Sequence, residues 1–186
     1  MRTNYSQLRF LKNTQTGRRQ FLRNVIVGGG AATLGTAFWP FTFAAGQTDA
    51  LLLSCMDYRL VGKTRSYMVH RGLGDKKYDH IVLAGASLGA ITDKFPEWNK
   101  TFWDELSLAI DLHGIYRVMV LDHRDCGAYK DIFGKDFAKN PAEETRVHAE
   151  QLRTLRHQID EKYGKRRRSL EVELLLMNLA GKVQKI

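Results

Sequence analysis

The sequence of 186 residues contains only two cysteines and three prolines, and residues 1–45 contain no acidic residue. The lack of acids at the front leaves six basic side chains there unbalanced: Arg2, Arg9, Lys12, Arg18, Arg19 and Arg23. Without those six, the 29 basic residues fall to 23 against 20 acidic ones, so the remainder carries a net charge of only +3. The overall charge of +9 therefore gives no reason to expect a nucleic-acid partner.

Hallmarks of several other protein classes are also missing. No internal repeat or low-complexity tract is visible from residue 46 onward. The glycine-rich stretch 27–35 lacks the preceding strand and the Lys-Ser/Thr ending of a phosphate-binding loop. The basic run 165–168 has no interleaved aromatic residues, which predicts a solvated loop and not a nucleic-acid site. A chain of this length, 44% hydrophobic and 26% charged, is typical of one soluble globular domain.

The acid-free front segment has a pattern of its own, TGRRQFLRNVIVGGGAATLGTAFWPFTFAAG (16–46). A paired arginine leads into a mildly apolar, Gly/Ala-rich stretch that ends in small residues. This resembles a twin-arginine (Tat) export signal. A membrane anchor or a buried helix is the alternative, but three consecutive glycines (28–30) and Pro40 disfavour a helix. We expect residues 1–45 to direct export through the Tat translocon to a bacterial periplasm, with a membrane tether if the signal is retained.

The remainder alternates between two kinds of pattern. Continuous apolar runs predict strands that are covered on both faces, as in parallel sheets. Between them, apolar residues recur at helical spacing. Alternating strands and helices predict a single α/β domain over 46–186, with a mainly parallel sheet flanked by helices and a short return strand after Gly181. The predicted strands are 50–55, 80–85, 116–123 and 170–179, and the predicted helices are 60–71, 95–114 and 141–164.

Both cysteines stand near the ends of predicted strands. Cys55 closes the first run, His123 closes the third, and Cys126 follows three residues later. Because ligands gather at the carboxyl ends of strands in open α/β sheets, we expect these three side chains at one edge. Two thiolates and an imidazole suit Zn²⁺, and catalytic zinc takes three protein ligands and leaves a fourth position for water. Asp57 and Arg59 follow Cys55 at steps of two, so an extended segment would point all three into one pocket.

Other interpretations of the same residues stay open. An even cysteine count in an exported protein also allows a disulfide between Cys55 and Cys126, or two thiols that only pack. Asp57 and Arg59 could form an ordinary surface ion pair.

Several ring-bearing side chains outside these motifs are expected to have structural roles. His148 and His157, on the helical pattern 141–164, are expected at the surface or its boundary. Trp98, Phe102 and Trp103 are expected in the core or in a subunit contact and not in a binding cage.

Two motifs in this order, CMDYRL (55–60) and HRDCGAY (123–129), resemble those of the β-class carbonic anhydrases. The segment LAGASLGAI (83–91) is similar to that family's Asn-Ala-Gly segment, with Leu83 where Asn is usual. The closing LLLMNLAGKVQKI (174–186) is similar to its final strand and turn. The resemblance covers roughly residues 50–186.

The resemblance implies a zinc lyase that hydrates CO₂ reversibly. Cys55, His123 and Cys126 would ligate Zn²⁺, and the hydroxide formed from its water would attack CO₂ to give bicarbonate. Asp57 would accept a hydrogen bond from that water, or take the fourth zinc position at rest, and Arg59 would hold Asp57 in place. The resemblance also implies a dimer or a multiple of dimers, with active sites near the interface.

The motifs leave the substrate and the proton path open. Relatives on this scaffold hydrolyse carbonyl sulfide or carbon disulfide, which are linear triatomics like CO₂. A non-catalytic envelope protein, stabilised by zinc or by a disulfide, is the alternative of another class. No proton-shuttle histidine is evident in the sequence.

Overall fold

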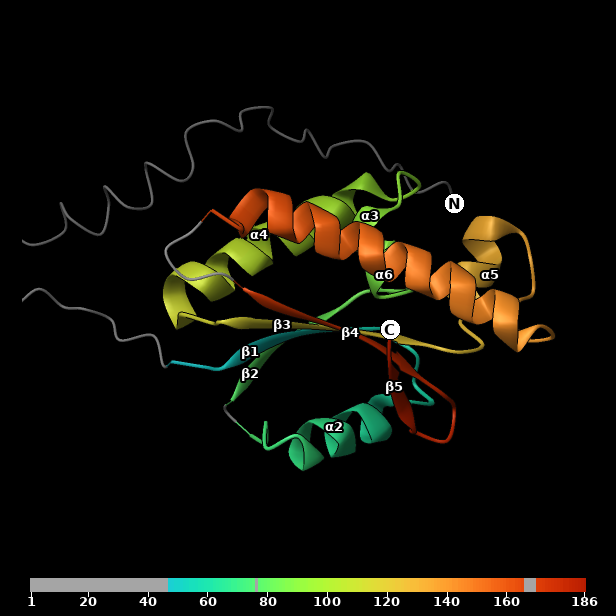
Figure 1. Ribbon diagram of the computed structural model, residues 1–186, viewed down its shortest axis with the longest axis horizontal. Coiled ribbons are helices and arrows are strands. Elements are labelled where there is room, and N and C mark those ends of the chain that lie inside the picture. Colours follow the sequence, from blue (N-terminus) through green and yellow to red (C-terminus); the bar gives the residue numbers. More distant parts are fainter. Residues whose placement is uncertain (1–46, 76, 166–169) are drawn as a thin grey trace, which may run out of the picture. The chain divides into compact units, whose positions relative to one another are not determined.

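The computed structural model describes residues 47–75, 77–165 and 170–186. They form a five-stranded sheet with helices on both of its faces (Figure 1). The predicted export signal 1–45 lies outside the described residues, and so does the basic run 165–168 apart from Lys165. Among the described residues, no helix has both the length and the apolar character needed to cross a bilayer.

The sheet has the strand order β2-β1-β3-β4-β5, in which the first four strands run parallel and β5 is antiparallel to β4. All residues of β1 are buried, as are all but the first of β3, which explains why these strands are continuously apolar. The predicted mainly parallel sheet is confirmed, including the short return strand. The bounds are β1 Ala50–Ser54, β2 Tyr78–Val82, β3 Arg117–His123, β4 Glu171–Met177 and β5 Val183–Lys185.

The helices divide unevenly between the two faces of the sheet. Figure 1 shows α2 (Val61–His70) alone on one face, and α3 (Ser87–Ile91), α4 (Pro96–His113) and α6 (Pro141–Tyr163) on the other. The short α5 (Gly127–Phe133) packs against the beginning of α6, where the rings of Tyr129 and His148 lie 3.8 Å apart. The sheet is therefore sandwiched between a thick and a thin helical layer.

The ends of the long helices follow from local residues. α4 ends at Gly114, which has a φ of +66°, a left-handed conformation that glycine adopts without steric cost. α6 begins with Pro141 in its first turn, and the Asn140 side chain accepts a hydrogen bond from the Glu143 N–H. The three predicted helices are confirmed, with ends within one residue of those expected from the sequence.

Two short helices, α3 and α5, were not predicted. They have five and seven residues, so neither completes two turns and neither can display a recurring apolar stripe. Both lie at the carboxyl edge of the sheet, since α3 follows the loop after β2 and α5 follows the loop after β3. The two helices that the apolar periodicity did not predict, α3 and α5, therefore lie at the edge of the sheet where the candidate ligands stand.

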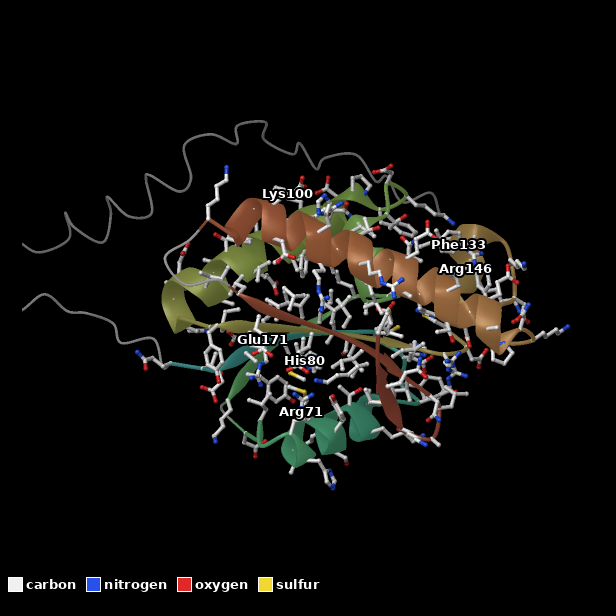
Figure 2. All side chains as sticks on the ribbon, in the orientation of Figure 1. Arg71, His80, Lys100, Phe133, Arg146 and Glu171 are labelled. Carbon is white, nitrogen blue, oxygen red and sulfur yellow. The ribbon has the colours of Figure 1, made fainter. Side chains whose placement is uncertain are left out.

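The core lies on both faces of the sheet because successive strand residues point to opposite sides. Leu51 and Leu53 of β1 pack in the cluster that contains Phe102 of α4, whereas Leu52 packs with Met68 of α2. Figure 2 shows side chains filling the space between the sheet and the helices. With both faces covered, the strands hold their carboxyl ends in fixed positions, and Cys55 and His123 lie at two of these ends.

Candidate metal centre

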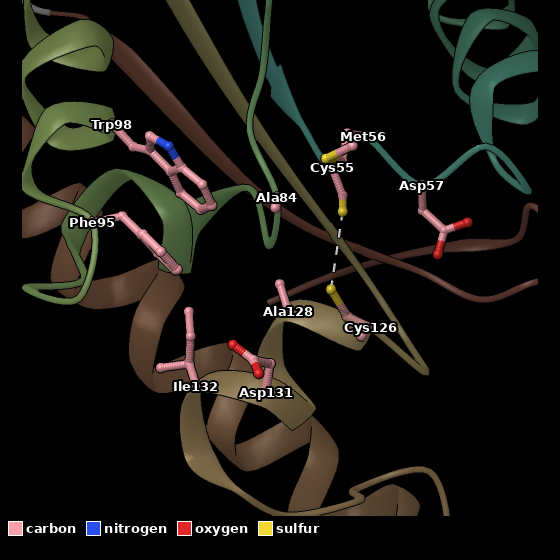
Figure 3. A pocket seen from close by; sticks show the side chains of 11 residues that line it. Cys55, Met56, Asp57, Ala84, Phe95, Trp98, Cys126, Ala128, Asp131 and Ile132 are labelled. Carbon is pink, nitrogen blue, oxygen red and sulfur yellow. Dashed lines mark hydrogen bonds between the residues drawn. The ribbon is translucent and has the colours of Figure 1, made fainter. Parts of the chain in front are cut away.

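Three predicted ligands from separate parts of the chain converge at the carboxyl edge of the sheet. One ligand atom each from Cys55, His123 and Cys126 lie within 4.8 Å of one another. The two Sγ atoms are 3.9 Å apart (Figure 3), far beyond the ~2.05 Å of a disulfide bond, and both thiols are free. Two thiolates on one tetrahedral zinc ion stand about 3.8 Å apart, so the spacing fits a shared ion.

The imidazole of His123 offers the third ligand atom. Its ring is buried, and Nδ1 lies 2.8 Å from the backbone carbonyl of Arg124, which can only accept, so Nδ1 carries the proton. The lone pair of Nε2 then points away from that bond. Among the described residues, Nε2 is one of very few buried side-chain polar atoms without a hydrogen-bond partner. An orphaned buried acceptor is costly unless something else binds it, and a metal ion would satisfy it.

The two thiols lie within hydrogen-bond distance of each other. The contact with Cys126 lowers the pKa of Cys55 to about 4, although burial opposes the shift. The Gly85 N–H, 3.3 Å from the same sulfur, also favours the thiolate. The bond to Cys55 and burial both raise the pKa of Cys126. Binding a divalent ion through both sulfur atoms requires both thiols to lose their protons, and the surroundings of Cys55 favour this loss.

Asp57 lines the site beside the ligands, as expected, but Arg59 does not line it. The segment turns here, with the Arg59 N–H donating to Asp57 Oδ1 at 2.9 Å, and Arg59 reaches the site only through Asp57. Met56 and Tyr58, on either side of Asp57, are 64% and 86% exposed. Arg59 donates to both carboxylate oxygens of Asp57, with Nη2 2.7 Å from Oδ2 and Nε 3.0 Å from Oδ1. Only 13% of the Asp57 side chain is exposed, so the pair is more than a surface ion pair.

The carboxylate of Asp57 faces the predicted ligands. Hydrogen bonds from Arg59 lower the pKa of Asp57 to about 2, so the carboxylate stays ionised at physiological pH. Its Oδ2 lies 3.8 Å from His123 Nε2. Asp57 can therefore accept a hydrogen bond from a group held beside the three ligands.

A cavity of about 280 Å³ opens onto the two sulfur atoms (Figure 3). Most of its wall is apolar, and Phe95 stacks on Trp98 with ring centroids 4.1 Å apart. Phe102 is fully buried and Trp103 packs against the core, as expected, whereas Trp98 in the first turn of α4 lines the cavity. A subunit contact at Trp98 stays a prediction. The lining residues are Cys55, Met56, Asp57, Ala84, Phe95, Trp98, Cys126, Gly127, Ala128, Asp131 and Ile132.

The segment after β2 supplies a group that sequence reasoning did not single out. Gly85, whose N–H donates to Cys55 Sγ, has a φ of +79°, and a Cβ added there would lie 3.2 Å from Cβ of Ala128. Both facts require glycine at this position. The available signal was Gly85, one of two glycines in the segment 83–91.

A buried polar network behind the ligands was also missed. Asp122, 1% exposed, accepts hydrogen bonds from Ser87 Oγ at 2.7 Å, Tyr129 OH at 2.6 Å and His148 Nδ1 at 2.9 Å. The expectation of a surface position for His148 is wrong, because the Asp122 carboxylate draws this ring inward and leaves it 1% exposed. His157 is exposed, as expected. This network ties β3 to α3, α5 and α6 next to His123.

Comparison with known proteins gives three findings. The family model described as "Putative carbonic anhydrase" matches residues 45–186. Over 140 residues, the chain is 39% identical to an uncharacterized protein of Rickettsia conorii, covering 75% of this chain and 73% of that protein, and 37% identical to an uncharacterized protein of Rickettsia bellii, covering 75% and 82%. A solved variant of the β-carbonic anhydrase CafD of Aspergillus fumigatus superposes with a TM-score of 0.50 at 14% identity, covering 83% of this chain and 96% of that one. At this identity the last likeness concerns the fold alone.

Proposed function

Because the chain belongs to this carbonic anhydrase family, we propose that it is a zinc-dependent carbonic anhydrase that hydrates CO₂ reversibly to bicarbonate. Cys55, His123 and Cys126 would hold the ion. Zinc bound there supplies Lewis-acid chemistry, lowering the pKa of water toward neutrality and so providing a hydroxide nucleophile. The observation that carries the proposal is the orphaned, buried Nε2 of His123 beside two sulfur atoms at zinc-like spacing.

The chain's own side chains would prepare the nucleophile. Asp57 is ionised and can accept one hydrogen bond from a water or hydroxide, which fixes the orientation of its lone pairs. Arg59 keeps that carboxylate in place through hydrogen bonds to both of its oxygens. The hydrogen bond from the Gly85 N–H likewise keeps Cys55 Sγ in place. These groups would orient the reactants and would not themselves form bonds to carbon.

The substrate would enter through the apolar cavity. Its wall contains no lysine, arginine or histidine, and its largest surfaces are the rings of Phe95 and Trp98. An uncharged linear molecule such as CO₂ loses little by leaving water for such a wall. Carbonyl sulfide and carbon disulfide share the same shape and lack of charge, so the cavity supports a carbonyl sulfide or carbon disulfide hydrolase as the second candidate function.

The location and assembly of the protein are further parts of the proposal. We propose that residues 1–45 direct Tat export to the periplasm ahead of a single domain over 46–186. We also propose a homodimer or a multiple of dimers, supported by the exposed Met56 and Tyr58 at the rim of the site. Sequencing the N-terminus of the exported protein tests the first, and the sedimentation velocity of Tyr58→Glu against wild type tests the second.

Metal analysis together with gas assays tests the activity. The full chain, purified without chelator, is expected to contain about one zinc per chain and to hydrate CO₂. Cys55→Ser, His123→Ala and Cys126→Ser should each lose zinc and at least ~10³-fold in rate, because hydroxide at neutral pH depends on the metal. His157→Ala, which changes an exposed histidine on α6, is the matched control and should change neither.

Three results would count against parts of this proposal. A folded and active metal-free protein would contradict the zinc mechanism. Rates that are higher on carbonyl sulfide or carbon disulfide than on CO₂, measured side by side, would favour the second candidate. Tight zinc binding without turnover of any of the three gases would indicate the non-catalytic zinc-binding protein.

A further inference from the structure

The loop between His123 and Cys126 contains a strained residue. Asp125 has a φ of +56°, one of two positive values among the described non-glycine residues. Such a conformation costs an L-residue free energy unless neighbouring groups hold it. Cys126 follows directly, so the backbone of Asp125 sets the direction in which the Cys126 side chain leaves the loop.

Glu144, in the first turn of α6, holds this loop. Its side chain is 4% exposed, and Oε1 accepts the backbone N–H of Asp125 at 2.6 Å. Oε2 accepts from Arg124 Nη1 at 2.9 Å, and Arg124 Nη2 donates to Thr145 at 2.7 Å. One buried carboxylate therefore fixes both residues between the ligands, one through its backbone and one through its side chain.

Other atoms of the same loop, which Glu144 does not contact, bind Arg59. The Asp125 carbonyl oxygen accepts from Arg59 Nη2 at 2.8 Å, and its Oδ2 accepts from Nη1 at 2.7 Å. The same guanidinium group binds Asp57 with Nε and Nη2. An unbroken series of charge-assisted hydrogen bonds thus runs from Glu144 through Asp125 and Arg59 to Asp57.

We propose that Glu144 is a positioning residue of the metal centre. It holds Asp125 in the left-handed conformation, so that the carbonyl and carboxylate of this residue fix Arg59 and, through it, the Asp57 carboxylate at the cavity. Glu144 also sets the exit direction of Cys126. The effect on turnover rests on the activity proposed above, whereas the effect on metal affinity rests only on metal binding by Cys55, His123 and Cys126.

The test uses Glu144→Gln and Glu144→Ala in the full chain. Glutamine keeps an oxygen for the Asp125 N–H but loses the charge that faces Arg124, whereas alanine loses both contacts. Zinc affinity, measured by competition with a chromophoric chelator, is expected to fall about 10–100-fold in the alanine variant and less in the glutamine variant. Loss of kcat with little change in KM should accompany it, since substrate contacts are untouched. The matched control is Glu150→Ala, which changes an exposed acid of the same helix.

A double-mutant cycle separates positioning from general support of α6. Glycine adopts a positive φ freely, so Asp125→Gly should weaken zinc binding in the wild type but should cost less, or restore affinity, in the Glu144→Ala background. The visible spectrum of the Co²⁺-substituted protein reports the ligand geometry in each variant. Additive effects on affinity, or a lower Tm with unchanged affinity and spectrum, would overturn the proposal.

The two proposals fail in distinguishable ways. A wild-type chain that binds zinc but turns over no gas would refute the proposed activity, and the affinity and spectral measurements would still decide the role of Glu144. If the alanine variant does not fold, the glutamine variant carries the same comparison. A glutamine variant with wild-type affinity, spectrum and kcat would exclude a role for the Glu144 charge.

Discussion

Two clusters of arginines and carboxylates lie at opposite ends of β3. The metal-edge cluster consists of Asp57, Arg59, Arg124, Asp125 and Glu144, and lies beside His123 where the strand ends. The far-edge cluster consists of Arg71, Arg117 and Glu173, and lies where the strand begins. Figure 2 shows Arg71 on the side of the sheet that α2 covers.

The difference between the clusters lies in what their charges face. In the far-edge cluster, Arg71 donates to both oxygens of Glu173, at 2.9 and 3.0 Å, and the contacts join α2 to β4. The metal-edge cluster surrounds an imidazole nitrogen without a partner and borders a cavity of about 280 Å³. Similar side chains thus join structural elements at one edge of the sheet and border the candidate binding site at the other.

Removing one arginine from each cluster should give the largest contrast. Arg59→Ala is expected to lower CO₂ hydration about 10–100-fold and to cost less stability than Arg71→Ala, because Asp57 loses its support but Arg59 itself is 33% exposed and solvent screens part of the pair. Arg71→Ala should leave the rate within twofold and destabilise the fold by about 1–3 kcal/mol, because Glu173, only 8% exposed, loses its closest partner. Urea unfolding and initial rates measure both. A loss of activity in the Arg71 variant similar to that in the Arg59 variant would abolish the distinction.

The pH dependence of stability sharpens the comparison. Arg59 lowers the pKa of Asp57 to about 2, below its ordinary value of 3.8, so this pair stabilises the fold above pH ~4 and the gain is lost as pH falls toward 2. The Tm difference between wild type and Arg59→Ala should therefore be largest above pH ~5 and should shrink as the pH falls below ~4. A Tm difference between these two proteins that instead grows as the pH falls would contradict the expected direction of the effect.

The same measurement on Arg71→Ala should give a different midpoint. Burial raises the pKa of Glu173, but the hydrogen bonds and charge of Arg71, together with the charges of Arg117 and Lys185, outweigh it, so the net shift in the native protein is downward. Without Arg71, burial dominates and the carboxyl takes up a proton at higher pH. The Tm difference between wild type and Arg71→Ala should begin to shrink at a higher pH than the Tm difference between wild type and Arg59→Ala.

The smallest expected effect concerns an outer cation of the far edge. Lys185 Nζ is 3.9 Å from Glu173 Oε2, and its side chain is 77% exposed. Lys185→Ala should change the free energy of unfolding by less than about 0.5 kcal/mol and leave the rate unchanged, since solvent screens the pair. A loss as large as that of Arg71→Ala would mean that the cluster depends on total charge and not on the bidentate contact.

The sequence predicted β1, β3, β4 and the long helices, because their burial shows in local apolar patterns. The strand expected over 80–85 is instead β2 at Tyr78–Val82, an edge strand in which only Ile81 is buried. Continuous apolar runs marked β1 and β3, and recurring apolar residues marked α4 and α6. Strand ends and short spacings also sufficed to nominate Cys55, His123, Cys126, Asp57 and Arg59, and the structure brings all five together. That they bind and use zinc stays a prediction.

Only the tertiary structure decided what surrounds those residues. Glu144 meets Asp125 across 19 positions, Ser87 meets Asp122 across 35, and Gly85 meets Cys55 across 30. Such pairs leave no periodic trace, because a polar side chain takes whichever partner the packed helices bring within reach. The identity of the ligands is thus a local property of the chain, whereas their orientation, the buried place of His148 and the aromatic wall of the cavity arise from contacts between distant segments.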